Sequence, residues 1–404
     1  MTSKLEITPF LPQDSALERH GLLDLATRLD REASRLSGMV PTESADTIRR
    51  HMAVINSYYS NLIEGNRTLP HEIREAQRGK YSDDPVKRDH QLESLAHIKV
   101  QGWIEGKNPT LDEVCSTDFI LELHRRFYEG LPESLRQVRD EKGIIAMVEP
   151  GQWRTRNVKV GQHIPPEAEG LESLMKGFCD EYRSARYPGN KRLISLACAH
   201  HRFLWIHPFL DGNGRVVRLW TDAAFRAAGL ESCGIWCLSR GLARRSASYK
   251  SALAQADFPR QGTSDGRGAL SEERLALFCK FMLVTALDQV RYITELLAFD
   301  GLRTRIRGYI DARNDGRIRG AEGKYKPVAA LLLYNAFLSG SLDRADAIAL
   351  TGMPERSARR LLRQLKDDGL LSETSSRSPL KWEIPEHAEP FYFPQLAPGA
   401  NSPY

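Results

Sequence analysis

The hydrophobic positions of the chain recur mostly at helical spacing. Between residues 47 and 62, apolar side chains recur at steps of three and four, which predicts an amphipathic helix with a C-cap at Gly65 and Asn66. Similar patterns predict helices over 89–106, 116–131, 168–187 and 192–206. The segment 192–206 is apolar nearly all round, which is typical of the buried central helix of a bundle.

A different pattern lies between Gly143 and Pro166. Residues 147–151 predict a turn because they end in a proline and a glycine, and residues 157–161 alternate polar with apolar side chains. We therefore expect a short β-hairpin in this region, closed by residues 164–166, in a chain that is otherwise helical.

A second compositional unit begins near residue 325. Its pattern predicts helices over 327–338, 344–350 and 354–367, and Pro354 suits the first position of the last helix. Two strand-like segments follow at 370–373 and 380–384. A helix, a helix-turn-helix and a two-stranded hairpin in this order predict a winged-helix domain.

The bulk composition excludes little. The chain has 404 residues, of which 41% are hydrophobic and 27% charged, an ordinary composition for two or three globular domains. Its net charge of +5 permits an anionic partner but also fits a plain soluble protein. No segment approaches the roughly 18 apolar residues that span a membrane, so we expect a cytoplasmic protein without membrane contact. The six cysteines form no CxxC pair, which favours buried reduced thiols.

One segment of twelve residues combines the residue types that handle phosphate. It reads His207-Pro208-Phe209-Leu210-Asp211-Gly212-Asn213-Gly214-Arg215-Val216-Val217-Arg218. Pro208 ends the preceding helix near His207, because the residue before a proline is disfavoured in the helical region. Gly212 and Gly214 can take positive φ, so the loop can turn its backbone N–H groups inward as an anion nest. A new helix is expected from about Arg215, and its positive N-terminus would face the same anion.

The side chains of this segment add a base, a metal ligand and two cations. Arg215 and Arg218 are three residues apart, so both project from the first turn of the new helix, and arginine forks suit phosphate oxygens. Asp211 is a hard oxygen ligand of the kind that Mg²⁺ prefers, and Mg²⁺ usually arrives with nucleotide phosphates. His207, with an unperturbed pKa of about 6.5, is suited to take a proton from an attacking hydroxyl. The segment therefore predicts an active site that handles phosphate.

Two further histidines precede this segment on the predicted buried helix. The spacing of His200 and His201 to His207 is not that of a zinc motif such as HExxH. We expect both to be core histidines with hydrogen-bond partners.

The twelve-residue segment resembles the signature of the Fic family. It matches at nine positions: His207, Pro208, Phe209, Asp211, Gly212, Asn213, Gly214, Arg215 and Arg218. The resemblance implies that His207 deprotonates a target hydroxyl and that Asp211 holds Mg²⁺ on the α- and β-phosphates of ATP. It also implies that the Gly212-Asn213-Gly214 loop binds the phosphates and that Arg215 and Arg218 engage the β- and γ-phosphates. Phe209 would pin the loop into the core.

A second segment, Ser60-Asn61-Leu62-Ile63-Glu64-Gly65, is similar to the inhibitory motif of some Fic proteins. Ser60 and Glu64 are four residues apart and share a helical face. The resemblance implies that Glu64 pairs with Arg218 and blocks the γ-phosphate position. The spacing alone also fits a solvated glutamate at a helix end.

The hairpin region resembles the flap by which Fic proteins hold a target peptide through strand addition. The similarity lies in the segment 153–158, which contains Arg154, Asn157 and Val158, and in residues 164–166.

Together these features predict a mainly α fold: a Fic-type helical bundle with a small β-hairpin flap, plus a C-terminal winged helix-turn-helix domain. The predicted division is an N-terminal helical region with the inhibitory motif (1–105), a catalytic core (106–255), a helical linker (256–324) and the winged helix (325–390). The implied activity is Mg²⁺-dependent transfer of AMP from ATP to a Tyr, Ser or Thr hydroxyl of a protein, including the chain itself. The alternatives are a DNA-binding regulator whose Fic domain senses nucleotide, and a Fic enzyme with another nucleotide reaction. The oligomeric state stays open, with a homo-oligomer among the alternatives.

The C-terminal unit also has the residues for a DNA contact. Residues 344–381 contain eight basic and five acidic side chains, and the linker 303–326 contains eight and three. The predicted recognition helix presents Arg356, Ser357, Arg359, Arg360 and Arg363, and Arg377 would lie at the wing tip. This charge pattern predicts a helix that enters the DNA major groove. A winged helix with a solvated basic face that contacts proteins is the alternative.

Overall fold

The computed structural model describes residues 4–139, 143, 145–183, 185–318, 323–396 and 398. Of the sequence features above, Ile144 in the predicted hairpin region, Ser184 in the predicted helix 168–187, and Arg319 and Glu322 in the linker 303–326 lie outside the described residues. The chain forms two compact units. The first contains Met1–Ser34, Asn56–Cys233 and Cys237–Gln289, and the second contains Arg35–Ile55, Gly234–Trp236 and Val290–Tyr404. Most of the predicted regions 1–105 and 106–255 fall in the first unit, and region 325–390 falls in the second.

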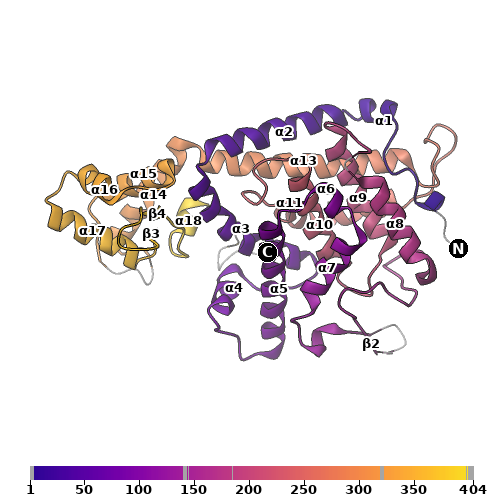
Figure 1. Ribbon diagram of the computed structural model, residues 1–404, viewed down its shortest axis with the longest axis horizontal. Helices are drawn as coiled ribbons and strands as arrows, with labels where there is room; N and C mark the ends of the chain where they lie inside the picture. Colours follow the sequence, from indigo (N-terminus) through magenta and orange to yellow (C-terminus); the bar gives the residue numbers. More distant parts are fainter. Residues whose placement is uncertain are drawn as a thin grey trace. The chain divides into compact units, whose positions relative to one another are not determined.

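Helices dominate both units (Figure 1). The first unit contains helices α1 (Asp14–Arg19), α4 (Pro70–Gln77), α5 (Pro85–Lys107), α6 (Leu111–Val114), α7 (Thr117–Tyr128), α8 (Leu171–Tyr182), α9 (Lys191–Ile206), α10 (Asn213–Ala227), α11 (Leu238–Arg244) and α12 (Ser246–Ala256), with strands β1 (Gln137–Arg139) and β2 (Ile145–Met147). The second contains α14 (Phe299–Asn314), α15 (Val328–Ser339), α16 (Arg344–Thr351), α17 (Glu355–Asp367) and α18 (Glu389–Tyr392), with strands β3 (Leu371–Ser372) and β4 (Lys381–Trp382). Helices α2 (Leu22–Met39), α3 (Thr42–Ile63) and α13 (Glu272–Leu297) contribute residues to both.

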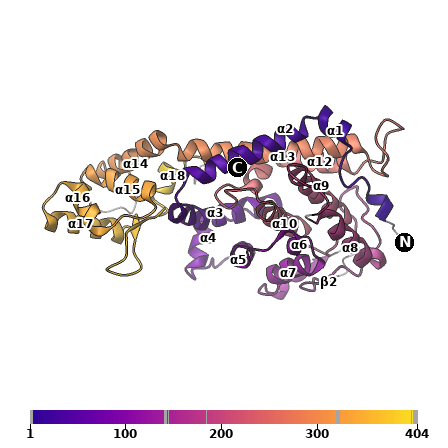
Figure 2. The ribbon, with the colours of Figure 1, turned by 45° about the horizontal axis from the view of Figure 1, so that its top comes forward.

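Helix α9 is the central helix of the first unit, as its apolar pattern predicts. Its residues from Leu193 to Phe203 are all buried, and it packs against α8 and α10. Figure 2 shows α9 and α10 side by side, as does Figure 1. The ring of Phe178 on α8 lies 5.7 Å from that of Trp220 on α10 and 6.0 Å from that of Phe203 on α9. Burial of such side chains stabilises the bundle by about 1.5–3 kcal/mol each.

Helix α10 also contacts α5, α6 and α7. These contacts matter for the site, because α5 and α7 bring side chains from distant parts of the sequence to the start of α10. Among the described residues, no helix is both long and apolar enough to cross a membrane.

The β-hairpin is present, but the predicted position of its strands is wrong. β1 pairs with β2 in antiparallel register, with Val138 opposite Ala146, so the turn predicted at 147–151 follows the hairpin. Residues 157–161 contribute only an isolated bridge between Val160 and His163. The physical reason is that the guanidinium of Arg154 binds the carbonyls of Arg156 and Pro166, on either side of these residues, and so holds them in a loop. The adjacent prolines at 165 and 166 cannot donate to a strand.

The C-terminal elements follow the predicted order. Helices α15, α16 and α17 precede the antiparallel pair β3–β4, in which Leu371 lies opposite Trp382. Leu342 forms an additional bridge with Leu380. The indole of Trp382 is buried and lies 5.2 Å from the ring of Phe337, so the hairpin packs on α15.

Candidate active site

The loop between α9 and α10 has part of the conformation that its sequence predicts: Gly212 takes positive φ, whereas Gly214 does not, because it lies in the first turn of α10. His207 caps α9 in the left-handed region with φ of 50°, and Gly212 precedes α10 with φ of 80°. Helix α10 begins at Asn213, two residues before the predicted start at Arg215. The side chain of Asn213 explains this earlier start, because it accepts a hydrogen bond from the Phe209 N–H at 2.9 Å and donates one to the Phe209 carbonyl at 2.8 Å. Asn213 therefore closes the loop, while its predicted contact with nucleotide stays a prediction.

Phe209 anchors the loop in the core, as predicted. Its side chain is fully buried, and its ring stacks on His124 of α7 with centroids 3.9 Å apart. Trp153 lies on the ring as well, at 5.1 Å. Loop, α7 and the segment after β2 are thus packed around one aromatic side chain.

His207 is half-buried, and its surroundings keep its imidazole neutral. Burial, together with the charges of Arg154 and His163, lowers its pKa to about 4. A neutral imidazole at pH 7 can accept a proton, so the state of His207 fits the predicted general base.

Arg154 ties the predicted flap to this loop. Its Nε donates to the His207 carbonyl at 2.8 Å, and its backbone N–H donates to the Pro208 carbonyl at 2.9 Å. Further donations reach the carbonyls of Arg156 and Pro166. Burial lowers the pKa of Arg154 to about 10, so the buried guanidinium remains charged at neutral pH. Sequence reasoning placed Arg154 in the flap but gave no sign of this role.

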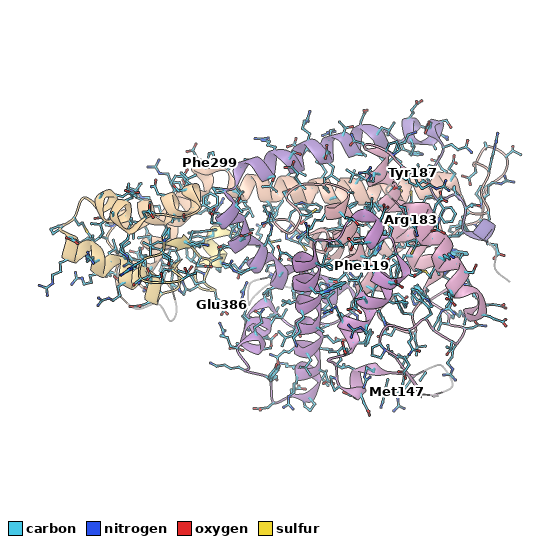
Figure 3. The ribbon with its side chains drawn as sticks, viewed as in Figure 1. Phe119, Met147, Arg183, Tyr187, Phe299 and Glu386 are labelled. Atoms are coloured by element: carbon cyan, nitrogen blue, oxygen red, sulfur yellow. The ribbon has the colours of Figure 1, made fainter. Side chains whose placement is uncertain are left out.

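A cleft of about 390 Å³ lies along the flap beside the loop. Its lining includes Met147, Trp153, Arg154 and Leu210. Met147, which is 37% exposed, is the end of β2 and is labelled in Figure 3. The other two predicted flap residues do not line the cleft: Asn157 is exposed and accepts a hydrogen bond from the Ala168 N–H at 2.9 Å, and Val158 is half-buried.

Asp211 presents an ionised carboxylate to solvent. Burial favours its neutral form, but the Arg215 guanidinium and the Tyr128 hydroxyl outweigh it and hold the pKa below its usual value. The Asp211 side chain is 44% exposed. Among the described residues, no group of three or more His, Cys, Asp or Glu side chains could hold a metal alone. A single exposed carboxylate fits Mg²⁺, which proteins usually bind through one or two carboxylates together with substrate phosphates.

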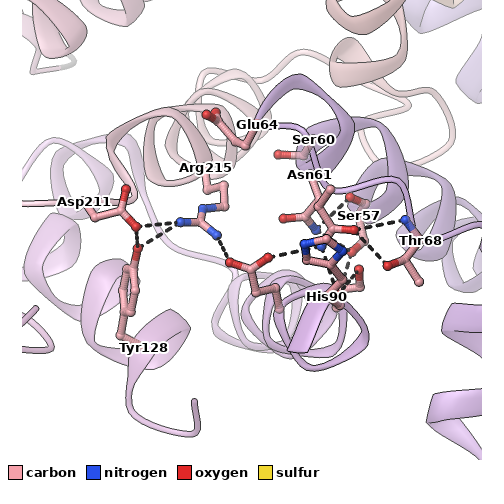
Figure 4. Close-up of polar contacts among 12 residues, drawn as sticks. Ser57, Ser60, Asn61, Glu64, Thr68, His90, Tyr128, Asp211 and Arg215 are labelled. Atoms are coloured by element: carbon pink, nitrogen blue, oxygen red, sulfur yellow. Dashed lines mark hydrogen bonds and ion pairs between the residues drawn. The ribbon is translucent and has the colours of Figure 1, made fainter. Parts of the chain in front are cut away.

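Arg215 is more deeply buried than Asp211 and donates hydrogen bonds to three side chains (Figure 4). Its Nη2 donates to Asp211 Oδ2 and to the Tyr128 hydroxyl, both at 2.9 Å, and its Nη1 donates to Glu93 of α5. Glu93 and Tyr128 were missed by sequence reasoning, because they lie on other helices, 122 and 87 residues away from Arg215.

The structure brings Ser60, Glu64 and Arg218 together. Arg218 Nη2 donates to Glu64 Oε1 at 2.6 Å, and Arg218 Nε donates to the Ser60 hydroxyl at 2.9 Å. Burial favours the neutral acid, yet the charges of Arg218 and Arg215 outweigh it, so the pKa of Glu64 lies below its usual value. A Cβ on Gly214 would overlap Glu64 Oε1, so the carboxylate lies directly against the phosphate loop.

The two upstream histidines are core residues with partners, as predicted. His200 contacts the Thr221 hydroxyl at 2.8 Å and the Tyr249 hydroxyl at 2.7 Å, and His201 lies 3.0 Å from the Asp257 carboxylate. All six cysteines are free thiols, and all but Cys233 are buried.

Comparison with known proteins decides the family of this region. Residues 114–224 match the Fic/DOC family. The chain carries a Fic domain. The matched residues contain α7, the flap, α9 and the whole phosphate loop, so the predicted resemblance is confirmed. Ser60, Glu64 and Glu93 lie before the matched residues.

Curated relatives match the Fic domain and its surroundings. A protein named Protein adenylyltransferase Fic from Drosophila willistoni is 31% identical over 206 residues, which are 50% of this chain and 38% of the relative. The protein of the same name from Nematostella vectensis is 30% identical over 227 residues, which are 54% of this chain and 47% of the relative. The match thus spans less than half of either relative.

Solved structures confirm the Fic-type helical fold. A Fic family protein from Desulfovibrio desulfuricans G20 has a TM-score of 0.52 at 19% identity and covers 89% of this chain and 96% of its own. Fic-1 from C. elegans, residues 134–508, has a TM-score of 0.52 at 18% identity and covers 70% of this chain and 73% of its own. At these identities the likeness concerns the fold.

Proposed function

We propose that the Fic domain transfers AMP from ATP to a Tyr, Ser or Thr hydroxyl of a protein, the chain itself included. The observation that carries this proposal is a neutral His207 beside a loop that offers a helix N-terminus, an ionised Asp211 and the nearby Arg218. The name shared by the curated relatives, Protein adenylyltransferase Fic, supports the same reaction.

In this mechanism, the Nδ1 or Nε2 atom of His207 takes the proton of the target hydroxyl. The hydroxyl oxygen forms a bond with the α-phosphorus of ATP, the bond to the β-phosphate oxygen breaks, and pyrophosphate leaves. The backbone N–H groups at the start of α10 would bind the phosphates, and the Gly212-Asn213-Gly214 turn would let them approach closely. When bound at Asp211, Mg²⁺ would supply positive charge to the phosphate oxygens.

The contact between Glu64 and Arg218 provides a restraint on this reaction. Arg218 would otherwise be free to engage the γ-phosphate, and the Glu64 carboxylate lies against Gly214 in the space that the γ-phosphate would use. We therefore assign Glu64 as the inhibitory residue, with Ser60 accepting hydrogen bonds from the Nε and Nη2 atoms of the same guanidinium.

The cleft beside the flap is the proposed place for the target. Its lining includes Met147 and, three residues after the proposed base, Leu210. A segment of the target chain would lie in it in extended form. Arg154 lines the cleft and donates to the His207 carbonyl, so it fixes the position of the cleft relative to the loop.

Intact-mass measurement of the full chain with ATP and Mg²⁺ tests the reaction. A gain that matches one AMP moiety is expected, and more strongly in the Glu64→Gly variant. A gain that matches a phosphate would assign a kinase reaction instead. Reversible nucleotide binding without any covalent gain, with protein targets present, would favour the nucleotide sensor.

A second candidate function concerns α17. Arg356, Arg359, Arg360 and Arg363 are all exposed, while Ala358, Leu361, Leu362 and Leu365 on the other face are buried. An amphipathic helix with an exposed basic face, followed by a hairpin loop that carries the exposed Arg377, suits DNA binding by a winged helix.

A further inference from the structure

One guanidinium joins four elements of the first unit. Arg215 of α10 contacts Glu93 of α5, Tyr128 of α7 and Asp211 of the phosphate loop. The Tyr128 hydroxyl accepts from Arg215 at 2.9 Å and donates to Asp211 Oδ2 at 2.6 Å, so Arg215 and Tyr128 hold the same carboxylate oxygen (Figure 4). Asp211 is thus fixed from two directions.

The exposure of these side chains shows which of them faces a ligand. Asp211 is 44% exposed, whereas Arg215 is 8% and Glu93 12% exposed, and Tyr128 is fully buried. A nucleotide phosphate that used the two Nη atoms of Arg215 would have to displace Glu93 and Asp211 from them. Glu93, which is 12% exposed, would then lose its guanidinium inside the protein, where an unpaired charge is costly.

Tyr128 and Glu93 are themselves held in place. The Tyr128 ring lies so close to Gly212 that a Cβ there would be 2.7 Å from the ring. The second oxygen of Glu93 accepts a hydrogen bond from the Asn66 side chain at 3.1 Å, in the turn that follows α3. Glu93 and Tyr128 thus lie on helices outside the phosphate loop, and each has a further contact that limits its movement.

We propose that Glu93, Tyr128 and Arg215 are positioning residues that orient Asp211 toward the metal ion of a metal–nucleotide, and that Arg215 is not a phosphate contact. This inference rests on the proposed function for the nucleotide site. The two arginines of the signature then have different roles. Arg218, once released by Glu64, contacts the nucleotide, whereas Arg215 acts only through Asp211. Residues that orient a metal ligand typically change metal affinity by about 10- to 100-fold when they are replaced.

Binding of a fluorescent ADP analogue to the full chain tests this division without any turnover. ADP lacks the γ-phosphate, so Glu64 does not compete with it. The dissociation constant is measured once in EDTA and once in saturating Mn²⁺. The ratio of the two constants gives the factor by which the metal strengthens ADP binding. In Tyr128→Phe and Arg215→Lys we expect this ratio to fall about tenfold or more. The affinity in EDTA should stay within about twofold of the parent value, because no phosphate contact is lost.

Tyr182→Phe is the matched control. Tyr182 is an equally buried tyrosine of the same unit, and its hydroxyl donates to the Phe10 carbonyl at 2.9 Å, away from the loop. Its replacement removes the same atom and should leave the metal ratio unchanged. A thermal melt shows whether Arg215→Lys is folded. If it is not, Glu93→Gln provides a further variant that tests the same role.

The possible outcomes distinguish a failure of this inference from a failure of the proposed function. If Arg215→Lys weakens ADP binding in EDTA about tenfold and keeps the metal ratio, Arg215 is a phosphate contact and the inference is overturned. An unchanged ratio in both Tyr128→Phe and Glu93→Gln overturns it as well. If the parent chain binds ADP under neither condition, the nucleotide site itself is absent and both proposals are overturned.

Discussion

At the scale of single residues, the protonation of His207 decides at which pH the site can work. Burial lowers its pKa from 6.5 to about 4, and Arg154 and His163 act in the same direction, while Asp211 opposes them. Below this pKa the imidazole is protonated and cannot accept the hydroxyl proton. The rate of AMP transfer should therefore stay constant as the pH falls through 6.5 and should decline only nearer 4. A pH profile of single-turnover AMP incorporation measures this, and an acid limb centred at 6.5 would contradict it.

Removal of the base gives a second prediction for the same residue. His207→Ala should slow AMP transfer by roughly a hundred- to ten-thousandfold, the usual contribution of a well-placed general base. ATP binding should persist, because the loop that binds phosphate is closed by Asn213 and Phe209 and not by the imidazole. Radiolabelled AMP incorporation and ATP affinity are measured on the same sample. Transfer at the parent rate would show that another group takes the proton.

At the scale of elements, α3 carries the restraint on the loop. Its last turn brings Glu64 to Arg218, 154 residues further along the chain. Glu64→Gly should raise auto-modification about a hundredfold, because misplacement of a reacting group by 1 Å can cost that much and the variant allows the α-phosphate to align. Incorporation of AMP into the purified chain measures the gain.

Two companion variants separate this pairing from a general loosening of α3. Ser60→Ala removes one hydrogen bond to Arg218 but keeps Glu64, so its gain should be small. In the double variant Glu64→Gly with Arg218→Ala the gain should disappear, since the released arginine orients the nucleotide. A double variant as active as Glu64→Gly alone would refute the role of Arg218 while leaving that of His207 intact.

The helices and strands also show which parts of the fold could be predicted from the sequence. Helices α3, α9 and α17 could be predicted because their side chains repeat locally with the helical period. The strands were placed wrongly because a single buried arginine, Arg154, binds the carbonyls of Arg156 and Pro166 on either side of the predicted strand, and periodicity does not detect such a contact.

The residues of the candidate site also fall into those that the sequence could predict and those that it could not. His207, Asp211 and their loop could be predicted because they are contiguous in the sequence. Glu93 and Tyr128 could not, because only the packing of α5 and α7 on α10 brings them to Arg215. The pairing of Glu64 with Arg218 was reached through a family resemblance, since nothing local connects two residues so far apart.

At the scale of the whole molecule, arginines serve two different chemistries in two units. Arg215 and Arg218 in the first unit are buried and paired with carboxylates, so each is held in one defined position at the site. The arginines of α17 in the second unit are exposed, and Arg359 pairs only with Glu355 one turn away. The net charge of +5 reveals neither arrangement, because the burial of each cation determines what it can bind.

The exposed set gives the prediction for DNA. Replacement of Arg356, Arg359 and Arg360 by alanine should weaken binding to duplex DNA and lower the slope of log affinity against log salt by up to about 2.7, because three fewer counterions are released. Fluorescence anisotropy with a labelled duplex, titrated at several salt concentrations, measures both quantities. The matched control replaces Arg28, Arg31 and Arg35, three exposed arginines of α2, and removes the same charge elsewhere. If both triple variants lose affinity equally, the binding is a general effect of charge and α17 is not a recognition helix. If the parent chain binds no DNA even at low salt, the exposed arginines of α17 contact another kind of partner, and a protein is then the class to test.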